Sequence, residues 1–502
     1  MTKYKFIKSI RLIGLLIAAL IFIAILFKVL NLKWPYCQRR LNLILISIDT
    51  LRADHLSCYG YTRKTSPHID ALAKEGVMFL NTVSHSPKTT PSHMSMMTSL
   101  HHDVHQVHQV NKWGPGKGAK RLNDSVPTLA EILQEQGYTT AAFTGGANVH
   151  ASLGFDKGFN IYTHDSAIDK VISWLNNNYQ RNFFLFFHTY AVHDPYLPPS
   201  PYNRMYDPDY SGDIIDSRDK LNKIVSDVRQ ANHSQAKDSL ALKSDQWWTG
   251  HDAFWASVDT ESSRDIDFLK ALYDGAINFM DDTMVGVLVQ RLKELNIYEN
   301  TLIVFTSDHG EAFGEHLNFL HNDLFWETLH VPLIIVYPKV LPKNIKIKQV
   351  VRLTDIMPTV FEIIGIKKNI FMQGESLLPA IKDADLALSC YSSYANMKSI
   401  RNEEYAYIKA IEYEYSSDAA EDETGEYKFI DIVKHEFLYN KLDDPTESNN
   451  IAAERLQLIA GQEEKLSELN KYYQELAKRY APSEIDLPDH DTLEKLRSLG
   501  YL

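Results

Sequence analysis

Cysteine is scarce in this sequence: Cys37, Cys58 and Cys390 are the only three among 502 residues. Three cysteines make no disulfide framework, and none of their spacings is the C-x-x-C of a zinc knuckle. Internal repeats and low-complexity segments are also missing, which excludes a solenoid or another repeat array. So few cysteines do not indicate whether the protein resides in an oxidising or a reducing compartment.

Positive charge is in short supply as well. The chain has 52 Lys and Arg against 64 Asp and Glu, a formal net charge of -12, and no basic patch stands out beyond the N-terminus. Such a surface repels nucleic-acid phosphates, so we expect no nucleic-acid partner. Hydrophobic residues are 44% and charged residues 23% of the chain, which is typical of a globular protein, and the length allows one large domain and a smaller one.

Long apolar runs are missing except at the N-terminus. Residues 12–27 are apolar without interruption, and Val29 and Leu30 extend the run past Lys28. Roughly nineteen residues rising 1.5 Å each span about 28 Å, close to the hydrocarbon thickness of a bilayer. A cleaved signal peptide is the alternative, but it has a shorter core and small residues at its cleavage site. We therefore predict an uncleaved single-pass anchor with a juxtamembrane linker over residues 1–40 and an extracytoplasmic main domain, in the periplasm or at the cell surface.

The next part of the chain alternates between strand-like and helical patterns. Apolar runs over residues 41–48, 139–143, 183–188 and 301–306 predict buried strands. A helix with Ser66 as its N-cap, Pro67 at its first position and Gly76 beyond its end follows the first run, and residues 269–295 form a long amphipathic pattern. This alternation predicts an α/β/α sandwich with a mainly parallel sheet.

We expect a main domain over residues 41–365 and a smaller α+β subdomain over residues 366–502. Residues 200–265 are polar, lack sheet periodicity and include Trp247 and Trp248, so we expect an insertion or lid near the mouth of the site. Residues 405–411 and 427–433 predict antiparallel strands, and residues 452–480 predict an amphipathic helix.

Candidate metal ligands stand where two predicted strands end. Asp49 closes the first strand, and Asp308, His309 and Gly310 close a second one some 260 residues later. A lone strand-end Asp is more often a cap or a solvated turn, but the carboxyl ends of parallel strands meet at one edge, where functional groups gather. We expect one or two divalent ions there. Mixed Asp and His ligation suits zinc or manganese, and calcium is an alternative.

From Asn42 to Leu502 the sequence resembles the sulfatases and the wider alkaline-phosphatase superfamily. The resemblance rests on ordered motifs at residues 48–55 and 58–61, 86–99, 306–311 with 314–316, 331–335, 354–359 and 496–501. It implies an alkaline-phosphatase-like fold, a catalytic domain over residues 41–365, and Asp49, Asp308 and His309 as metal ligands.

Thr89 occupies the nucleophile position of this family. True sulfatases have Cys or Ser, any residue, Pro, any residue and Arg there, whereas this chain has Thr89, Thr90, Pro91, Ser92 and His93. Threonine cannot be oxidised to formylglycine, so no formylglycine is expected. Relatives that transfer phosphoryl groups use a threonine, so Thr89 is predicted to be a nucleophile that also contacts the metal. A turn hydroxyl that caps a helix beginning near Pro91 is the alternative, and both roles are compatible.

Histidines cluster after the nucleophile segment and recur later. His193 resembles the family histidine that contacts the oxyanion and protonates the leaving oxygen, and His321 lies where relatives place a Lys or His for the same group. His93 and His105 are predicted to bind substrate. The rest of the tract is expected to face solvent or to bond local backbone groups: His85, His101, His102 and His108.

These patterns lead to three functional hypotheses. The first is a membrane-anchored, metal-dependent hydrolase or transferase of phosphate monoesters or diesters, whose substrate is a lipid or an envelope glycan. The single predicted anchor favours a hydrolase, because lipid transferases of the superfamily often carry several spans. The second is a sulfatase that acts without formylglycine, and the third is a non-catalytic, membrane-tethered binding protein.

Overall fold

The computed structural model describes residues 41–108, 120–235, 250–367, 370–382, 386–415 and 429–484. All of them belong to one compact unit, Leu41–Leu502. The predicted anchor, the Trp247 and Trp248 pair and the closing motif at residues 496–501 lie outside the described residues. Within the described ranges, no helix combines the length and the apolar character that crossing a bilayer requires.

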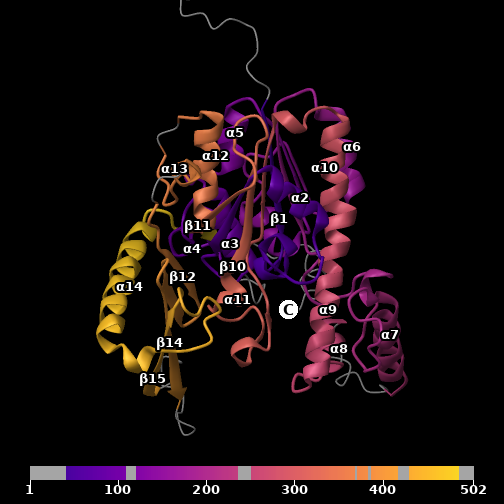
Figure 1. The fold of residues 1–502 in the computed structure, drawn as a ribbon, viewed down its shortest axis with the longest axis vertical. Helices are drawn as coiled ribbons and strands as arrows, with labels where there is room; N and C mark the ends of the chain where they lie inside the picture. Colours follow the sequence, from indigo (N-terminus) through magenta and orange to yellow (C-terminus); the bar gives the residue numbers. More distant parts are fainter. Residues whose placement is uncertain are drawn as a thin grey trace, which may run out of the picture. The chain divides into compact units, whose positions relative to one another are not determined.

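Eight strands form the central sheet. Their bounds are Asn42–Ile48 (β1), Val77–Val83 (β2), Thr139–Phe143 (β4), Ile161–Thr163 (β5), Phe183–Thr189 (β6), Thr301–Thr306 (β7), His330–Val336 (β10) and Ile345–Arg352 (β11). Their order across the sheet is β11-β2-β10-β7-β1-β6-β4-β5 (Figure 1). Every neighbouring pair is parallel except the two that β10 makes. The mainly parallel sheet that the apolar runs predict is therefore confirmed.

Helices cover both faces of this sheet. One face packs against α2 (Pro67–Glu75), α6 (Ile168–Asn178), α9 (Ser263–Met280) and α10 (Val287–Glu294), and the other against α3 (Thr89–Thr98), α5 (Leu129–Glu135), α12 (Ile356–Ile364) and α13 (Leu378–Ile381). In β1, Ile44 and Ile46 join the first core, whereas Leu43 and Leu45 join the second. Successive side chains point to opposite faces, so a strand buried on both faces is apolar at every position.

The long helix predicted over residues 269–295 is interrupted once. A π-helical segment, Asp281–Gly286, joins α9 to α10. It places Asp281 at the start of α2, where the carboxylate accepts the backbone N–H groups of His68 and Ile69, both at 2.8 Å. Ser66 holds the N-cap position, but its hydroxyl donates to Asp70 instead of capping. The predicted N-cap position of Ser66 is confirmed, but a distant carboxylate and not the Ser66 hydroxyl satisfies the free N–H groups.

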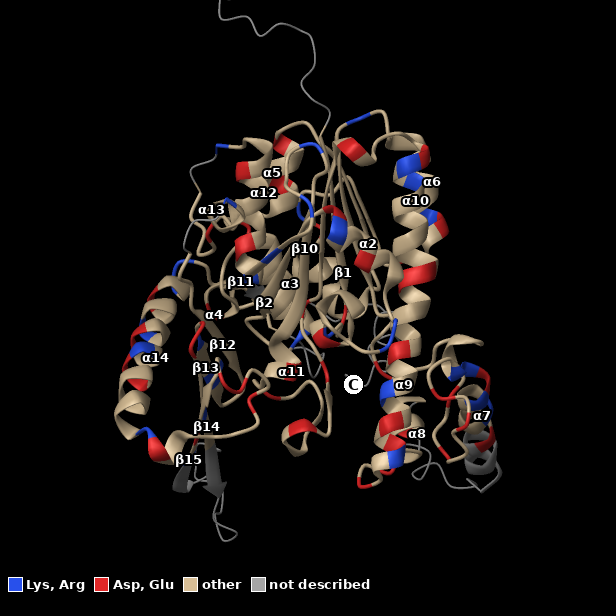
Figure 2. Cartoon of the chain, viewed as in Figure 1, with Lys and Arg blue, Asp and Glu red and all other residues tan. Residues whose placement is uncertain are grey.

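The C-terminal part has a sheet of its own. Strands β12 (Cys390–Tyr394), β13 (Met397–Arg401), β14 (Tyr405–Tyr415) and β15 (Phe429–Asn440) pair antiparallel in that order, and α14 (Leu456–Ala477) packs on them (Figure 1). This agrees with the α+β organisation expected after residue 365. Charged side chains lie along α7 (Arg218–Gln235), α10 and α14, whereas the central strands carry few (Figure 2).

The remaining elements are short. They are α4 (His102–His105), α8 (Gly250–Ala256), α11 (Trp326–Leu329), β3 (Lys120–Arg121), β8 (Ala312–Phe313), β9 (Phe319–Leu320) and β16 (Ser483–Glu484). The two described cysteines, Cys58 and Cys390, are free.

A buried ion pair of the C-terminal part lies where this part meets the main domain. Arg401 and Glu447 are 1% and 0% exposed, and Arg401 Nε and Nη2 donate to the Glu447 carboxylate at 3.0 and 2.9 Å. Arg401 also donates to the backbone oxygen of Leu324. Removing one partner of such a pair leaves the other charge buried without adequate compensation.

Replacing Arg401 with methionine is expected to lower the free energy of unfolding by about 3–5 kcal/mol, because among the described cations Lys441 alone, at 3.4 Å, then forms an ion pair with Glu447. Urea denaturation followed by circular dichroism measures the change. The control is Lys478→Met, which breaks the exposed pair with Glu475 and should cost about 1 kcal/mol or less. Equal midpoints for the two variants would contradict the stabilising role of the buried pair.

Candidate active site

The predicted metal ligands come together at the carboxyl ends of two parallel neighbours, β1 and β7. Asp49, Asp308 and His309 are all 0% exposed. His309 Nε2 lies 3.9 Å from Asp49 Oδ1 and 3.4 Å from Asp308 Oδ2. Because β1 and β7 are neighbours in the sheet, Asp49 lies next to Asp308 and His309 although they are far apart in the sequence.

Thr89 points its hydroxyl at the same cluster. Helix α3 begins at Thr89 with Lys88 in the N-cap position, slightly earlier than the predicted start near Pro91. Thr89 Oγ1 lies 3.4 Å from His309 Nε2. The positive end of the helix dipole therefore lies where an attacking oxygen develops negative charge.

This arrangement fits a divalent cation. His309 Nδ1 donates to the backbone oxygen of Gly310 at 3.0 Å, which leaves the Nε2 lone pair facing the carboxylates. Asp49 Oδ1 and Asp308 Oδ2 are buried and accept no hydrogen bond from the described residues. Donor atoms bound to one ion at about 2.0–2.2 Å lie about 3–4 Å apart, as these atoms do.

The electrostatics of the cluster favour a cation as well. Burial raises the pKa of Asp49 to about 6, and the charge on His193 limits that rise. Burial and then the charge on Asp49 raise the pKa of Asp308 to about 8. Burial lowers the pKa of His309, so its imidazole is neutral, the form that binds metal. Two buried carboxylates without a counter-charge are unfavourable, and a bound cation removes that penalty.

Gly310 is needed for close packing of two segments and not for a left-handed backbone. Its φ is not positive. A Cβ at this position would lie 2.0 Å from the backbone oxygen of Glu327, so only glycine allows this close approach of the two segments.

His188 holds Asp49, and sequence reasoning did not single it out. It lies near the end of β6, the other parallel neighbour of β1. Its Nδ1 accepts the N–H of Gly145 at 3.2 Å, so its Nε2 donates to Asp49 Oδ2 at 3.2 Å. A sequence pattern could have indicated this role, because His188 is the polar residue that ends the apolar run 183–188.

His93 lies between Thr89, β1 and Asp308. Its Nδ1 donates to the backbone oxygen of Thr89 at 3.0 Å and lies 3.4 Å from Asp308 Oδ2, and its Nε2 contacts Ser47 Oγ at 2.9 Å. These contacts make it a positioning residue for the nucleophile segment and for Asp308. Its predicted contact with substrate stays a prediction.

His193 borders the cluster through Asp49 and is held by Asp194. His193 Nε2 lies 4.0 Å from Asp49 Oδ1, and its Nδ1 lies 3.1 Å from Asp194 Oδ1. Burial lowers the pKa of His193, but the hydrogen bond and charge of Asp194 outweigh it and raise the pKa to about 9. Asp194 Oδ2 in turn accepts His251 Nε2 at 2.9 Å and Trp255 Nε1 at 3.0 Å. The segment predicted as an insertion over residues 200–265 thus contributes two side chains beside the site.

His321 completes a group of three imidazoles. Its ring centroid lies 4.6 Å from that of His309 and 5.4 Å from that of His193. His321 Nδ1 contacts Glu311 Oε1 at 3.0 Å. Next to the nucleophile, Lys88 Nζ donates to Asn322 at 2.7 Å. Lys88 and Glu311 both lie inside motifs that the sequence analysis used, but their roles were not predicted.

The rest of the histidine tract differs from expectation. His85, His101, His102 and His105 are buried, and only His108 is exposed. The expectation of solvent exposure is wrong because the C-terminal part covers the tract: His101 stacks on Tyr473 of α14 with centroids 4.7 Å apart. Bonding to local backbone groups is confirmed for His101, whose Nδ1 accepts the N–H of Asp103 at 3.1 Å, whereas His85 Nδ1 bonds the distant Tyr391 oxygen at 2.9 Å.

His105 lies in α4, and both of its ring nitrogens contact protein groups. Its Nε2 contacts Ser95 Oγ and its Nδ1 accepts the N–H of Val107, each at 3.1 Å. This indicates a packing role between α3 and α4.

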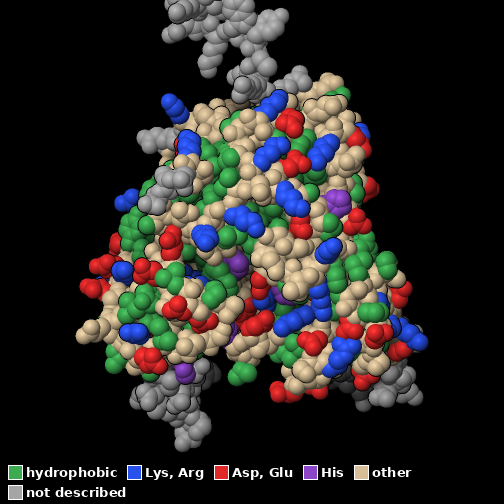
Figure 3. Space-filling view, viewed as in Figure 1, with side chains coloured by type: hydrophobic (Ala, Val, Ile, Leu, Met, Phe, Trp, Pro, Cys, Tyr) green, Lys and Arg blue, Asp and Glu red, His purple; other side chains and the backbone are tan. Residues whose placement is uncertain are grey.

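On the face seen in Figure 3, histidines line a hollow with both basic and acidic side chains around it.

Comparison with known proteins gives matches over most of the chain. The family profile described as Sulfatase matches residues 41–366, and the profile described as N-sulphoglucosamine sulphohydrolase, C-terminal, matches residues 314–472. Arylsulfatase K of Mus musculus is 24% identical over 476 residues, which cover 86% of this chain and 79% of that protein. N-acetylglucosamine-6-O-sulfatase of Bacteroides thetaiotaomicron is 24% identical over 523 residues, with 89% and 88% covered.

Among solved structures, phosphonate monoester hydrolase of Agrobacterium radiobacter superposes with a TM-score of 0.63 at 20% identity, covering 86% of this chain and 96% of that one. At this identity the likeness shows the fold alone.

Proposed function

The chain belongs to the sulfatase family of the alkaline-phosphatase superfamily, and we propose that it is a metal-dependent hydrolase of sulfate esters whose alcohol part is a saccharide. The observation that carries the proposal is the Thr89 hydroxyl 3.4 Å from His309 Nε2, beside two buried carboxylate oxygens to which no described residue donates a hydrogen bond. The sulfatases among the relatives support sulfate, and the relative that acts on N-acetylglucosamine supports a saccharide.

In this proposal, Asp49, Asp308 and His309 hold the cation. When bound, the cation lowers the pKa of the Thr89 hydroxyl and offsets charge on the ester oxygens. Thr89 passes its hydroxyl proton to water, and its Oγ attacks the central atom of the ester in line with the leaving oxygen, whose bond to that atom breaks. A water molecule then attacks the same atom, which releases sulfate and returns the hydroxyl to Thr89. His193 keeps its Nδ1 on Asp194, so its Nε2 proton is the one that goes to the leaving oxygen.

His321 and Lys88 then bind the oxyanion. Burial raises the pKa of Glu311 well above its usual range, so its neutral carboxyl donates to His321 Nδ1. His321 Nε2 consequently carries a proton that it donates to an oxygen of the transferred group. The ammonium of Lys88, next to the nucleophile, adds positive charge at the same place.

Phosphate or phosphonate esters are the second candidate. Thr89 and His93 stand in place of the formylglycine precursor and the arginine of true sulfatases, which favours phosphate esters. The relatives favour the sulfate alternative instead. One of the similar structures is a phosphonate monoester hydrolase, and this supports phosphorus esters as the second candidate substrates. A purely non-catalytic role fits less well, because the family consists of hydrolases and the site retains its metal-binding groups and its hydroxyl.

A substrate panel separates the candidates. The full chain in detergent is offered an aryl sulfate, N-acetylglucosamine 6-sulfate, an aryl phosphate, a phosphodiester and a phosphonate monoester, with and without chelator. We expect the highest kcat/KM on a sulfate ester and loss of activity with chelator. Faster turnover of a phosphorus ester would reverse the order of the two candidates, and no turnover of any substrate would contradict both.

Replacing Asp194 with asparagine is expected to lower the pKa of His193 from about 9 and to lower kcat about 100-fold. The acidic form of His193 donates the proton, so activity falls as pH rises through this pKa. The pH profile of kcat/KM measures the shift, and its alkaline limb should move to lower pH. The control, Asp252→Asn, alters an exposed carboxylate 3.9 Å from His251 and should leave the profile unchanged. An unshifted alkaline limb in Asp194→Asn would exclude His193 as the acid.

A further inference from the structure

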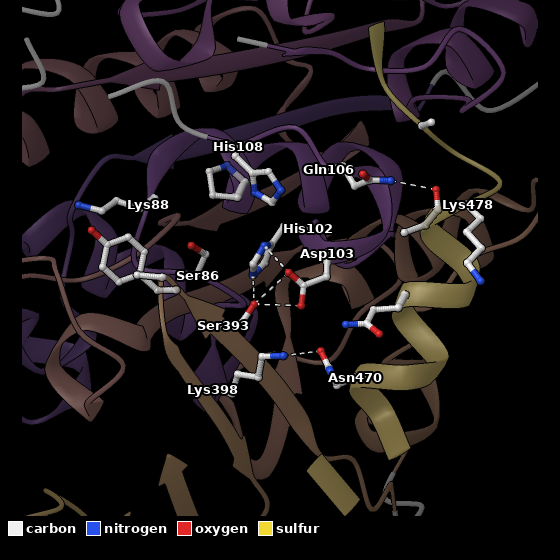
Figure 4. Close-up of a pocket in the computed structure, with 16 residues that line it drawn as sticks. Ser86, Lys88, His102, Asp103, Gln106, His108, Ser393, Lys398, Asn470 and Lys478 are labelled. Carbon is white, nitrogen blue, oxygen red and sulfur yellow. Dashed lines mark hydrogen bonds and ion pairs between the residues drawn. The ribbon is translucent and has the colours of Figure 1, made fainter. Parts of the chain in front are cut away.

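A cavity of about 790 Å³ lies between α4, the strands β12 and β13, and α14 (Figure 4). Its lining includes His102, Asp103 and His108 from the histidine tract, and Ser393 from β12. None of the catalytic assignments uses these residues. Figure 4 shows His102, Asp103 and Ser393 joined by contacts, with the His108 ring next to them.

His102 presents an unused nitrogen in this cavity. Its Nε2 lies 3.1 Å from the backbone oxygen of His85. A carbonyl oxygen only accepts, so Nε2 carries the proton and donates. Burial lowers the pKa of His102 despite the opposing charge of Asp103, so the ring is neutral and Nδ1 is a bare lone pair. The side chain is 4% exposed, and Nδ1 has no hydrogen-bond partner among the described residues.

The atom that faces this lone pair is a carboxylate oxygen. Asp103 Oδ1 lies 3.4 Å from His102 Nδ1. The Asp103 carboxylate also accepts the Ser393 hydroxyl at 3.1 and 3.0 Å, which leaves it acceptor capacity. Two acceptors this close, one on a buried ring and one on a carboxylate that is 27% exposed, repel each other unless a cation lies between them.

The 3.4 Å separation suits a metal better than a proton. Two ligands of a tetrahedral zinc, with bonds of about 2.0–2.2 Å, lie about 3.3–3.5 Å apart. A charge-assisted hydrogen bond between imidazolium and carboxylate is shorter, about 2.7–2.9 Å. The spacing is therefore that of two ligands on one ion.

His108 lies beside this pair in the lining of the same pocket. Its ring centroid lies 5.8 Å from that of His102, with the planes at 83°. Two imidazoles on one zinc have centroids about 5–6 Å apart. His101 is close but does not contribute, because its Nδ1 accepts the N–H of Asp103 and its Nε2 donates to the Tyr391 oxygen.

We propose that His102 Nδ1, the Asp103 carboxylate and His108 bind a divalent cation of the zinc type, separate from the catalytic centre. Three protein ligands leave a fourth position that faces the cavity, where water or an anionic group completes the tetrahedron. The site does not depend on the proposed hydrolase activity, since it shares no ligand with Asp49, Asp308 or His309.

Zinc titration of the chelator-treated full chain in detergent tests this site, with bound metal measured by calorimetry and by elemental analysis. The variant His102→Gln keeps a donor for the His85 oxygen but removes Nδ1, and Asp103→Asn keeps an acceptor for Ser393 but removes the charge. Each should bind one equivalent of zinc less than the unmodified chain, or bind it more than about 100-fold more weakly. The control His68→Gln removes an exposed histidine and should bind zinc as the unmodified chain does.

Asp308→Asn separates the two sites. It is expected to lose zinc at the catalytic centre and to keep the equivalent that His102→Gln loses. If Asp308→Asn keeps all its zinc while His102→Gln loses one equivalent, the catalytic assignment fails and this site stands. Zinc binding by folded His102→Gln and Asp103→Asn that equals the unmodified chain in number and affinity would overturn the proposal. Should His102→Gln not fold, Asp103→Asn alone decides in the same way.

Discussion

Replacing Thr89 with alanine is expected to lower kcat by about 10,000-fold or more. The Thr89 hydroxyl lies 3.4 Å from His309 Nε2 at the first residue of α3, and loss of a nucleophile removes the covalent route altogether. Thr89→Ser keeps the hydroxyl and should keep a measurable part of the activity. Steady-state kinetics on the best substrate of the panel measures both variants.

The matched control for this prediction is Thr90→Ala. Thr90 is the next residue of the same helix, but its hydroxyl donates to the Asn148 backbone oxygen at 2.6 Å. Its loss should change kcat only a few-fold. Metal analysis of Thr89→Ala shows whether the hydroxyl also holds the cation. A Thr89→Ala enzyme that turns over at a rate comparable to Thr90→Ala would exclude Thr89 as the nucleophile.

Replacing Asp308 with asparagine is expected to abolish metal binding at the catalytic centre and to remove the stabilisation that this metal gives. In the unmodified chain, a metal at 100 times its Kd adds about 2.7 kcal/mol to the free energy of unfolding, and the variant should gain only what metal at the second site contributes. Without metal, the variant should be the more stable of the two, because it removes one of two buried carboxyl groups. Thermal denaturation of the unmodified chain and of Asp308→Asn, each with added zinc and with chelator, measures these four stabilities.

The pH dependence of the metal-free protein follows from the same two carboxyl groups. The folded-state pKa values are raised from 3.8 to about 6 for Asp49 and to about 8 for Asp308. An acid with a raised folded-state pKa stabilises the fold below its unfolded pKa, and this stability is lost as pH rises through the folded one. Between about pH 4 and pH 8, these two carboxyl groups should therefore make the stability of the metal-free protein fall relative to that of Asp308→Asn. An exposed control, Asp124→Asn, should follow the unmodified chain, and identical curves for Asp308→Asn would contradict the argument.

Much of the fold could be predicted because its signals are local. The strands β1 and β7 are apolar at every position, which is the pattern of a strand covered on both faces. Because parallel strands end at one edge of a sheet, the positions of Asp49 and Asp308 at two such ends predicted a common site. The same argument applies to His188, because it is the polar residue near the end of β6, another parallel neighbour of β1.

The remaining features depend on partners that are distant in the sequence. The cap of α2 comes from Asp281 and not from the adjacent Ser66. Asp194 is held by His251 and Trp255, which follow it by more than fifty residues. The histidine tract is buried because a later helix covers it. Periodicity describes the faces of one element and carries no information about which distant segment covers it.

The anchor over residues 1–40, the extracytoplasmic location and the domain boundary at residue 365 stay predictions of the sequence. An anchored enzyme would remain at the membrane surface and act on glycans within reach of it. Fractionation of the full chain and of a chain that starts at Leu41 tests the anchor, since only the full chain should stay with the membrane.

The central claim is that Thr89 takes up the transferred group from the substrate. Rapid quenching of the enzyme with excess aryl ester, followed by high-resolution mass spectrometry of the peptide that contains Thr89, tests it most directly. The account predicts a transient sulfate or phosphate on Thr89, absent when chelator is present and absent in Asp308→Asn. Turnover of the ester without any modified Thr89 at any quench time would contradict it.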